Sequence, residues 1–140
     1  MSNYKTFTQQ RNEAFFRTCT QIAREAAPRT LTDRRIVELA LKRPTDYFYV
    51  SLDATIRRLR RMRAGGAPTV AARADREMLL LLDRLTAGYE FRFGLTDLHA
   101  LQRVHTDCGA PCYYICPATA VKIFRRYRKA AAMKNPKTTN

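Results

Sequence analysis

Apolar residues recur at intervals of three and four over six stretches of the chain, which is the pattern of amphipathic helices. In the first stretch, for example, Ala14, Phe15 and Ile22 fall on one side of a helical wheel. Three stretches follow a hydroxyl side chain that can accept a hydrogen bond from the first turn, at Thr32, Ser51 and Thr96. We therefore expect helices at about 9–26, 32–42, 52–63, 69–87, 96–104 and 117–133.

The fourth of these helices carries an apolar run, residues 78–82, that covers every side of it. A helix that is apolar all round is expected to be the most buried helix of its fold. Gly88 is expected to end it, because residues 89–93 then alternate between large and charged side chains with the period of a strand. The aromatic segments at 46–50 and 112–115 are expected to be extended and to pack between helices. Their tyrosines stacking on nucleic-acid bases is the alternative.

One block of the sequence occurs twice. Residues 49–63 are matched by 114–128, and each copy has an aromatic residue, a β-branched residue and then a basic amphipathic stretch. The triplet Leu-Thr-Asp at 31–33 recurs at 95–97, so two blocks repeat in the same order at nearly equal spacing. Such self-similarity indicates an internal duplication. The sequence thus predicts a mainly α-helical protein of two tandem, internally duplicated three-helix units with short extended aromatic segments.

The predicted boundary between the two units is a short stretch rich in glycine and alanine that ends in a proline. We expect a first helical unit at 1–64, a linker at 65–68, a second helical unit at 69–134 and a disordered tail at 135–140. Residues 1–8 are expected to form a loosely held arm. The two halves should superpose, and they should pack together through the helix that contains the 78–82 run, because units of this size are marginally stable alone.

The charge of the chain predicts the kind of partner that it binds. Lysine and arginine total 26 against 12 acidic residues, which gives a net charge of +14. Ten of the basic residues lie in the two predicted basic helices at 52–63 and 117–129, and no acidic residue follows Asp107. A protein with this imbalance is expected to bind a polyanion, which is DNA, RNA or an acidic membrane surface.

Three features of the sequence favour nucleic acid over a membrane or predict a cytoplasmic protein. No apolar run approaches the roughly 20 residues that a membrane span needs. The first residues lack the apolar core of a signal peptide, so the four cysteines are expected to stay reduced. A basic helix can also lie on a membrane surface, but the apolar arc of each basic stretch is needed for the core.

The two basic stretches are the predicted binding site. In the first of them, Leu52, Ile56 and Leu59 fall on one arc of a helical wheel, and arginines fall on the other arc. Arginine forks suit phosphates and guanine edges, so duplex DNA is the favoured partner. The residues expected to contact it are Arg57, Arg58, Arg60, Arg61, Lys122, Arg125, Arg126 and Lys129. We therefore expect a non-enzymatic DNA-binding protein, such as a regulator or an accessory protein of a mobile element or phage.

Three helices of which the third is basic resemble helix-turn-helix domains in helix count and charge placement. The link between the second and third predicted helices is longer than the tight turn of that motif, however. A second interpretation is a structural or interaction module whose basic faces meet an acidic protein partner. A third interpretation is a zinc- or thiol-dependent enzyme.

Histidines and cysteines cluster near the second copy of the repeat. Five of them lie within eighteen residues, at His99, His105, Cys108, Cys112 and Cys116. Zinc is bound by both residue types, but the cysteines lack the C-x2-C spacing of common zinc sites. The first copy of the repeat also has Ser51 in place of Cys116. We therefore expect no metal, no cofactor and no catalytic residues.

Overall fold

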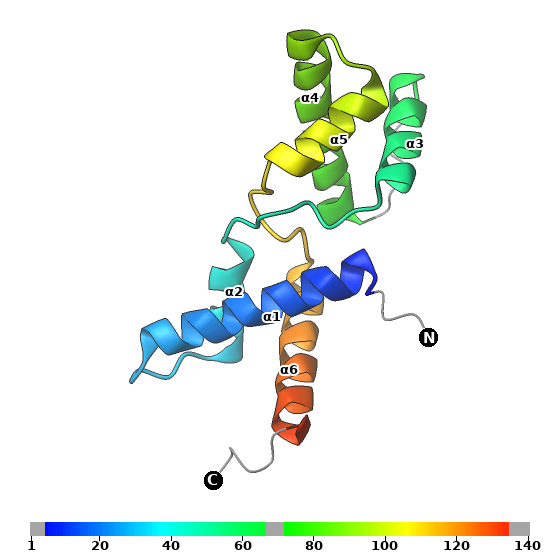
Figure 1. The fold of residues 1–140 in the computed structure, drawn as a ribbon. Coiled ribbons are helices and arrows are strands. Elements are labelled where there is room, and N and C mark those ends of the chain that lie inside the picture. The colour runs from blue at the N-terminus through cyan, green and yellow to red at the C-terminus, as the bar shows by residue number, and fades with distance from the viewer. Residues whose placement is uncertain (1–4, 67–71, 135–140) are drawn as a thin grey trace. The chain divides into compact units, whose positions relative to one another are not determined.

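The computed structural model describes residues 5–66 and 72–134, and within them the backbone forms six α-helices and no strand (Figure 1). The helices are α1 (Phe7–Ala26), α2 (Asp33–Leu41), α3 (Leu52–Arg63), α4 (Arg73–Phe93), α5 (Asp97–Asp107) and α6 (Pro117–Lys134). The predicted mainly helical class is confirmed. The predicted tail at 135–140, the end of the predicted linker and the expected start of the fourth helix lie outside the described residues.

Side-chain caps determine where several helices begin. The predicted caps accept a hydrogen bond from the amide three residues later, at 3.2 Å for Thr32, 3.3 Å for Ser51 and 3.4 Å for Thr96. Each cap satisfies a donor that the helix itself leaves unpaired. α1 begins inside the predicted N-terminal arm, because Thr6 and Gln9 form a capping box with bonds of 3.0 and 2.8 Å. The prediction of an arm is therefore wrong for residues 7 and 8.

α4 continues through Gly88, where the sequence predicts its end. The predicted strand at 89–93 is therefore wrong, because these residues form the end of α4. Their large side chains meet along the helix, where the rings of Tyr89 and Phe93 have centroids 5.4 Å apart. α4 ends before Gly94, whose φ of 63° is left-handed and favours glycine.

The apolar run of α4 is buried on one side only. Leu79 and Leu82 are buried, whereas Leu80 keeps 44% of its surface exposed. The prediction that this is the most buried helix is wrong, because only Leu79, Leu82 and Thr86 of α4 are buried, whereas α1 has five buried residues. Large apolar side chains at the exposed side include Phe91, which is 93% exposed.

The chain divides into two compact units that do not follow the halves of the sequence. Unit 1 combines the described parts of 1–43 and 115–140, and therefore contains α1, α2 and α6. Unit 2 is the continuous stretch 44–114, and contains α3, α4 and α5. The predicted units were 1–64 and 69–134. In the structure, the third helix of each sequence half packs with the first two helices of the other half, so that α3 packs with α4 and α5, and α6 packs with α1 and α2.

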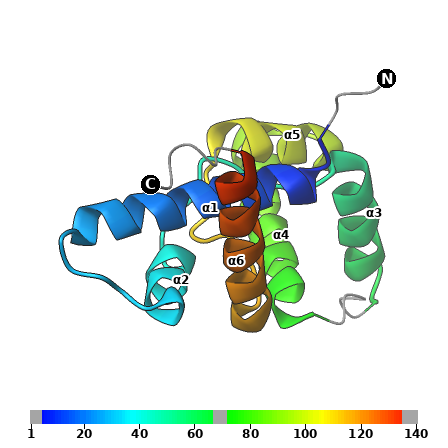
Figure 2. The same cartoon turned by 90° about the horizontal axis from the view of Figure 1, so that it is seen from below.

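Unit 1 has its core where α1, α2 and α6 meet. Phe15 and Cys19 of α1, Val37 of α2 and Phe124 of α6 are buried there. Phe16 of α1 lies against α6, with its ring centroid 6.0 Å from that of Phe124. Both views show α1 and α2 beside α6 (Figures 1 and 2).

Unit 2 has a core of the same kind between α3, α4 and α5. Leu59 of α3, Leu82 of α4, and Leu101 and Val104 of α5 are buried in one cluster. Phe48, from the first aromatic segment, completes this cluster and is only 1% exposed. That segment forms no strand, so its role is to place one ring in the core of unit 2.

The segments that enter and leave unit 2 meet at an isolated antiparallel bridge between Thr45 and Ala110. The amide of Thr45 donates to the carbonyl of Ala110 at 2.8 Å, and the amide of Ala110 donates back at 3.1 Å. Gly109 lies so close to this bridge that a Cβ atom there would stand 2.4 Å from the Thr45 carbonyl oxygen. Glycine is therefore required at this position by the close approach of two backbones.

Equivalent ion pairs join the basic helix of each unit, α3 or α6, to a short helix of the same unit, α5 or α2. In unit 2, Arg60 of α3 donates to the Asp97 carboxylate of α5 at 2.7 and 2.9 Å. In unit 1, Asp33 of α2 accepts from Arg125 at 3.0 Å and from Arg128 at 2.7 and 2.9 Å, both of α6. Asp33 and Asp97 both follow a threonine cap, and Arg60 and Arg125 are matched positions of the sequence repeat. The duplication itself stays a prediction.

Candidate nucleic-acid interface

The two predicted binding helices are held in different units, and each buries its apolar arc. α3 turns Ile56 and Leu59 into the core of unit 2, and α6 turns Ile123 and Phe124 into the core of unit 1. Because the apolar arcs are fixed in this way, the opposite arcs face solvent. All eight predicted contact residues are exposed, at Arg57, Arg58, Arg60, Arg61, Lys122, Arg125, Arg126 and Lys129.

Two of these eight residues are already engaged by carboxylates. Arg60 holds Asp97, and Arg125 holds Asp33 together with Arg128. Hydrogen bonds from Arg128 and Arg125 lower the pKa of the Asp33 carboxyl to about 2. The hydrogen bond from Arg60 likewise lowers the pKa of Asp97 to about 2. Arg60 and Arg125 therefore join helices within their units, a role that competes with phosphate binding.

The other six residues are less constrained. The Arg57 side chain donates to the Asp53 carbonyl at 3.2 Å, and the Arg126 guanidinium lies 5.5 Å from the ring centroid of Tyr127. Neither contact neutralises charge. The side chains of the remaining four have no ion pair or hydrogen bond within the described part of the chain, namely Arg58, Arg61, Lys122 and Lys129. The exposed arcs of α3 and α6 thus present cations that lack a protein counterion.

Positive charge is concentrated in unit 1. The stretches 1–43 and 115–140 hold 16 basic and 4 acidic residues, whereas 44–114 holds 10 and 8. Moreover, all four acidic residues of unit 1 are in ion pairs, at Glu13, Glu25, Asp33 and Glu38. The surface of unit 1 therefore carries basic side chains with hardly any free carboxylate beside them.

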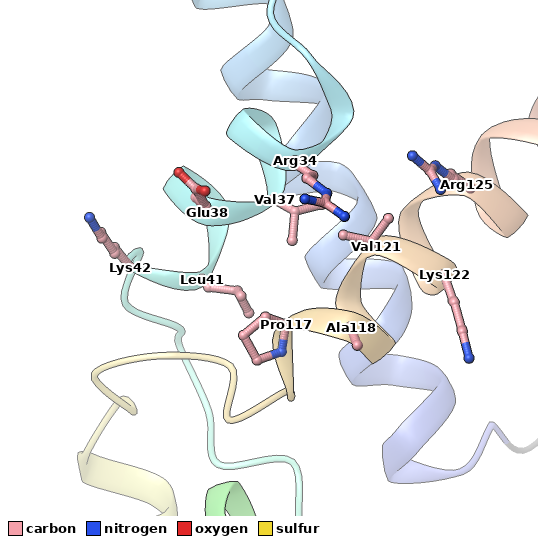
Figure 3. Close-up of a pocket in the computed structure, with 10 residues that line it drawn as sticks. All are labelled: Arg34, Val37, Glu38, Leu41, Lys42, Pro117, Ala118, Val121, Lys122 and Arg125. Atoms are coloured by element: carbon pink, nitrogen blue, oxygen red, sulfur yellow. The ribbon is translucent and has the colours of Figure 1, made fainter.

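A groove between α2 and α6 is a feature that the sequence did not indicate (Figure 3). It has a volume of about 810 Å³ and lies entirely within unit 1. Apolar side chains from both helices form its floor, at Val37, Leu41, Pro117, Ala118 and Val121. Basic side chains stand at its rim, at Arg34, Lys42, Lys122 and Arg125. Arg34 and Lys42 were missed because α2 and α6 are far apart in sequence.

The arginines of α3 and α6 that sequence reasoning left out of the site have structural roles. Arg63 lies between Asp83 and Glu90 of α4, at 2.8 and 2.6 Å, and Arg128 binds Asp33 of α2. Only the tertiary partner distinguishes these arginines from their exposed neighbours.

The cysteines are unbridged, and no group of three His, Cys, Asp or Glu residues that could hold a metal ion occurs among the described residues. Cys19 is buried in unit 1, and burial raises the pKa of its thiol to about 12. Cys116 is exposed before α6, where hydrogen bonds from the backbone of Ala118 and Thr119 lower the pKa of its thiol. Cys116 thus takes the position before α6 that Ser51 takes before α3.

Comparison with known proteins found no matching family model, no similar curated protein and no similar solved structure. None of the described helices is both long enough and apolar enough to cross a membrane.

Proposed function

We propose that this chain is a non-enzymatic protein that binds duplex DNA through the exposed basic arcs of α6 and α3. One observation carries the proposal. On both helices, basic residues without a carboxylate partner gather on the arc opposite the buried one, as at Arg61 of α3 and Lys122 of α6. Cations placed in this way bind phosphates and release the counterions of the duplex, which drives association.

The contribution of the two helices differs in this proposal. α6 belongs to unit 1, which carries most of the net charge, so its arc of Lys122, Arg126 and Lys129 supplies the larger part of the affinity. The arc of α3, with Arg57, Arg58 and Arg61, adds a second contact. Two linked contacts raise the affinity through the effective concentration of the second one.

The proposal extends to the origin and setting of the protein. The chain arose by internal duplication, and the third helices were exchanged between the two copies. Supporting this, Asp33 and Asp97 bind arginines of the opposite copy at matched positions. A small cytoplasmic regulator, or an accessory protein of a mobile element or phage, would use two such units on one stretch of duplex.

Alanine variants of the two arcs test the proposal. One variant replaces Lys122, Arg126 and Lys129, the second replaces Arg57, Arg58 and Arg61, and the control replaces Arg76, Arg84 and Arg92 of α4. Each removes three charges, and all nine side chains are exposed, so circular dichroism should show unchanged helix content. We expect the α6 variant to bind a duplex at least about tenfold more weakly in fluorescence anisotropy, because it loses three phosphate contacts.

The α3 variant should weaken binding to a smaller extent, and the α4 control should change it least. Equal losses in all three variants would mean that net charge alone drives binding, and would contradict the proposed site. Wild-type protein that prefers single-stranded DNA or RNA to the duplex in the same titration would contradict the proposed partner.

A further inference from the structure

The groove between α2 and α6 exposes apolar surface that unit 1 leaves uncovered. Leu41 of α2 and Val121 of α6 are only half-buried, and Pro117 and Ala118 at the start of α6 are exposed. In the close-up, Leu41 reaches toward Pro117 from the facing helix (Figure 3). A concave apolar floor of this kind gains free energy when an apolar side chain covers it.

The rim of the groove has a charge that selects the occupant. The side chains of Arg34, Lys42 and Lys122 form no ion pair or hydrogen bond within the described residues, and the rim's one acid, Glu38, is bound to Arg35 at 3.2 Å. Figure 3 shows Lys42 and Lys122 pointing outward from opposite sides of the apolar floor. An occupant with apolar residues on one face and carboxylates on its flanks would satisfy both features.

We propose that this groove binds an acidic amphipathic helix of a partner protein. The α2 wall of the groove runs from Arg34 to Lys42, which is about 12 Å at the helical rise per residue. That length accommodates about two turns of a helix, so that apolar residues at i, i+3 or i+4, and i+7 cover the accessible part of the floor at Leu41, Pro117 and Val121. Glutamates on either side of this stripe would then reach Arg34, Lys42 and Lys122.

A nucleic acid fits the groove less well. None of the described residues that line the groove is aromatic, so an unpaired base finds no ring there to stack on. A duplex would leave the apolar floor uncovered, because its phosphates contact cations rather than aliphatic carbon. The rim shares Lys122 with the arc proposed to bind duplex DNA, but the inference rests on the apolar floor, which that arc does not use.

A synthetic peptide tests the inference on the full chain. The probe has about 15 residues, long enough to form a helix when bound, with leucines at i, i+3, i+4 and i+7 and glutamates elsewhere. A control peptide has the same composition in an order that spreads the leucines around the helix. We expect fluorescence anisotropy to show saturable binding of the probe that persists at high salt, whereas weak binding of the control disappears as salt screens the charges.

Variants of the floor locate the binding site. Leu41→Glu and Val121→Glu should each weaken probe binding at least about tenfold, because they place a carboxylate on the apolar floor. Leu80→Glu on α4 is the matched control, since it makes an equal charge change at an exposed leucine of unit 2, and it should leave binding unchanged. Val121→Ala keeps an apolar side chain at this position, so circular dichroism should be unaltered. It removes part of the apolar floor and should therefore weaken probe binding several-fold.

Three results would overturn the proposal. The first is equal binding of the probe and the control peptide at every salt concentration. The second is full probe affinity in the folded Val121→Ala variant together with an equal loss in Leu41→Glu and Leu80→Glu. The third is a groove variant that weakens duplex DNA binding while the wild-type chain shows no saturable binding of the probe.

Discussion

Asp33 and Asp97 each interact favourably with their own helix and bind a second helix. Each is the first residue of its helix, where a negative charge is favoured by the helix dipole. Each carboxylate also binds an arginine of a helix that is distant in sequence, α6 for Asp33 and α3 for Asp97. Because the hydrogen bonds favour the ionised form, both pKa values fall to about 2.

The lowered pKa values predict how stability depends on pH. An unfolded aspartate has a pKa of about 3.9, so the ion pairs contribute fully above that pH and are lost as the pH falls toward about 2. We expect the free energy of unfolding to decrease over this interval in urea titrations. Asp33→Asn should cost about 1 kcal/mol or less at neutral pH, since the arginine partners are more than half exposed.

The difference between wild type and Asp33→Asn should shrink as the pH is lowered and vanish near pH 2. A difference that stays constant down to that pH would show that the substitution acts through packing or backbone rather than through the carboxylate.

At the scale of single residues, the sequence predicted the caps and left the ion pairs unseen. Thr32, Ser51 and Thr96 act on amides three residues away, so local sequence was enough to identify them. Arg60 was predicted to contact DNA because its partner, Asp97, is 37 residues away. A helical wheel shows that a side chain is exposed, but it does not show which carboxylate of another helix stands beside it.

At the scale of elements, the helices were predicted well and the strand was not. The alternation at 89–93 covers five residues, which is too few to distinguish a strand from about one and a half turns of helix. α4 continues because its Leu79, Leu82 and Thr86 are already buried in the core of unit 2, and the next turns extend an existing helix. Likewise, the apolar composition of the run at 78–82 does not predict how many helices pack against it.

Two glycines test this account of α4 and of the bridge in unit 2. Gly88 lies inside α4 with nothing within 4 Å of a Cβ position, so Gly88→Ala should stabilise the protein by about 0.5–1 kcal/mol. Gly109→Ala should destabilise it by about 1–3 kcal/mol, because the new methyl group would meet the Thr45 carbonyl. Urea denaturation of both variants measures the two effects.

Opposite signs for the two alanine variants are required by the structure. A destabilised Gly88→Ala protein would mean that residues near Gly88 are not helical, in favour of the strand that the sequence pattern indicates.

At the scale of the whole molecule, the repeat in the sequence did not reveal how the helices are distributed between the two compact units. Local periodicity identifies α3 and α6 as basic helices with an apolar arc, but any pair of helices with an apolar face could receive them. The pairing is selected by long-range contacts, such as those of Leu59 with α4 and α5 and of Phe124 with α1. Such contacts are invisible to a reading of neighbouring residues.

The division into units predicts which fragments fold. Residues 44–114 contain the whole of unit 2, so this fragment alone should unfold cooperatively in urea, with the modest stability of a small domain. A fragment of residues 1–64 contains α1, α2 and α3 but lacks α6, and α3 lacks α4 and α5. It should therefore show little helix by circular dichroism.

The reverse outcome is a fragment 1–64 that folds cooperatively and a fragment 44–114 that is unfolded. It would favour the sequential units at 1–64 and 69–134, and would contradict the packing of α3 and α6 with helices of the opposite sequence half.

The salt dependence of duplex DNA binding tests the central claim most directly. If the arcs of α6 and α3 together neutralise about six phosphates, the affinity should fall on the order of a thousandfold between about 50 and 200 mM salt. The slope of log affinity against log salt should become shallower by about 0.9 for each phosphate contact that a variant of Lys122, Arg126 or Lys129 removes. A wild-type chain that shows no affinity for duplex DNA at low salt would contradict the account.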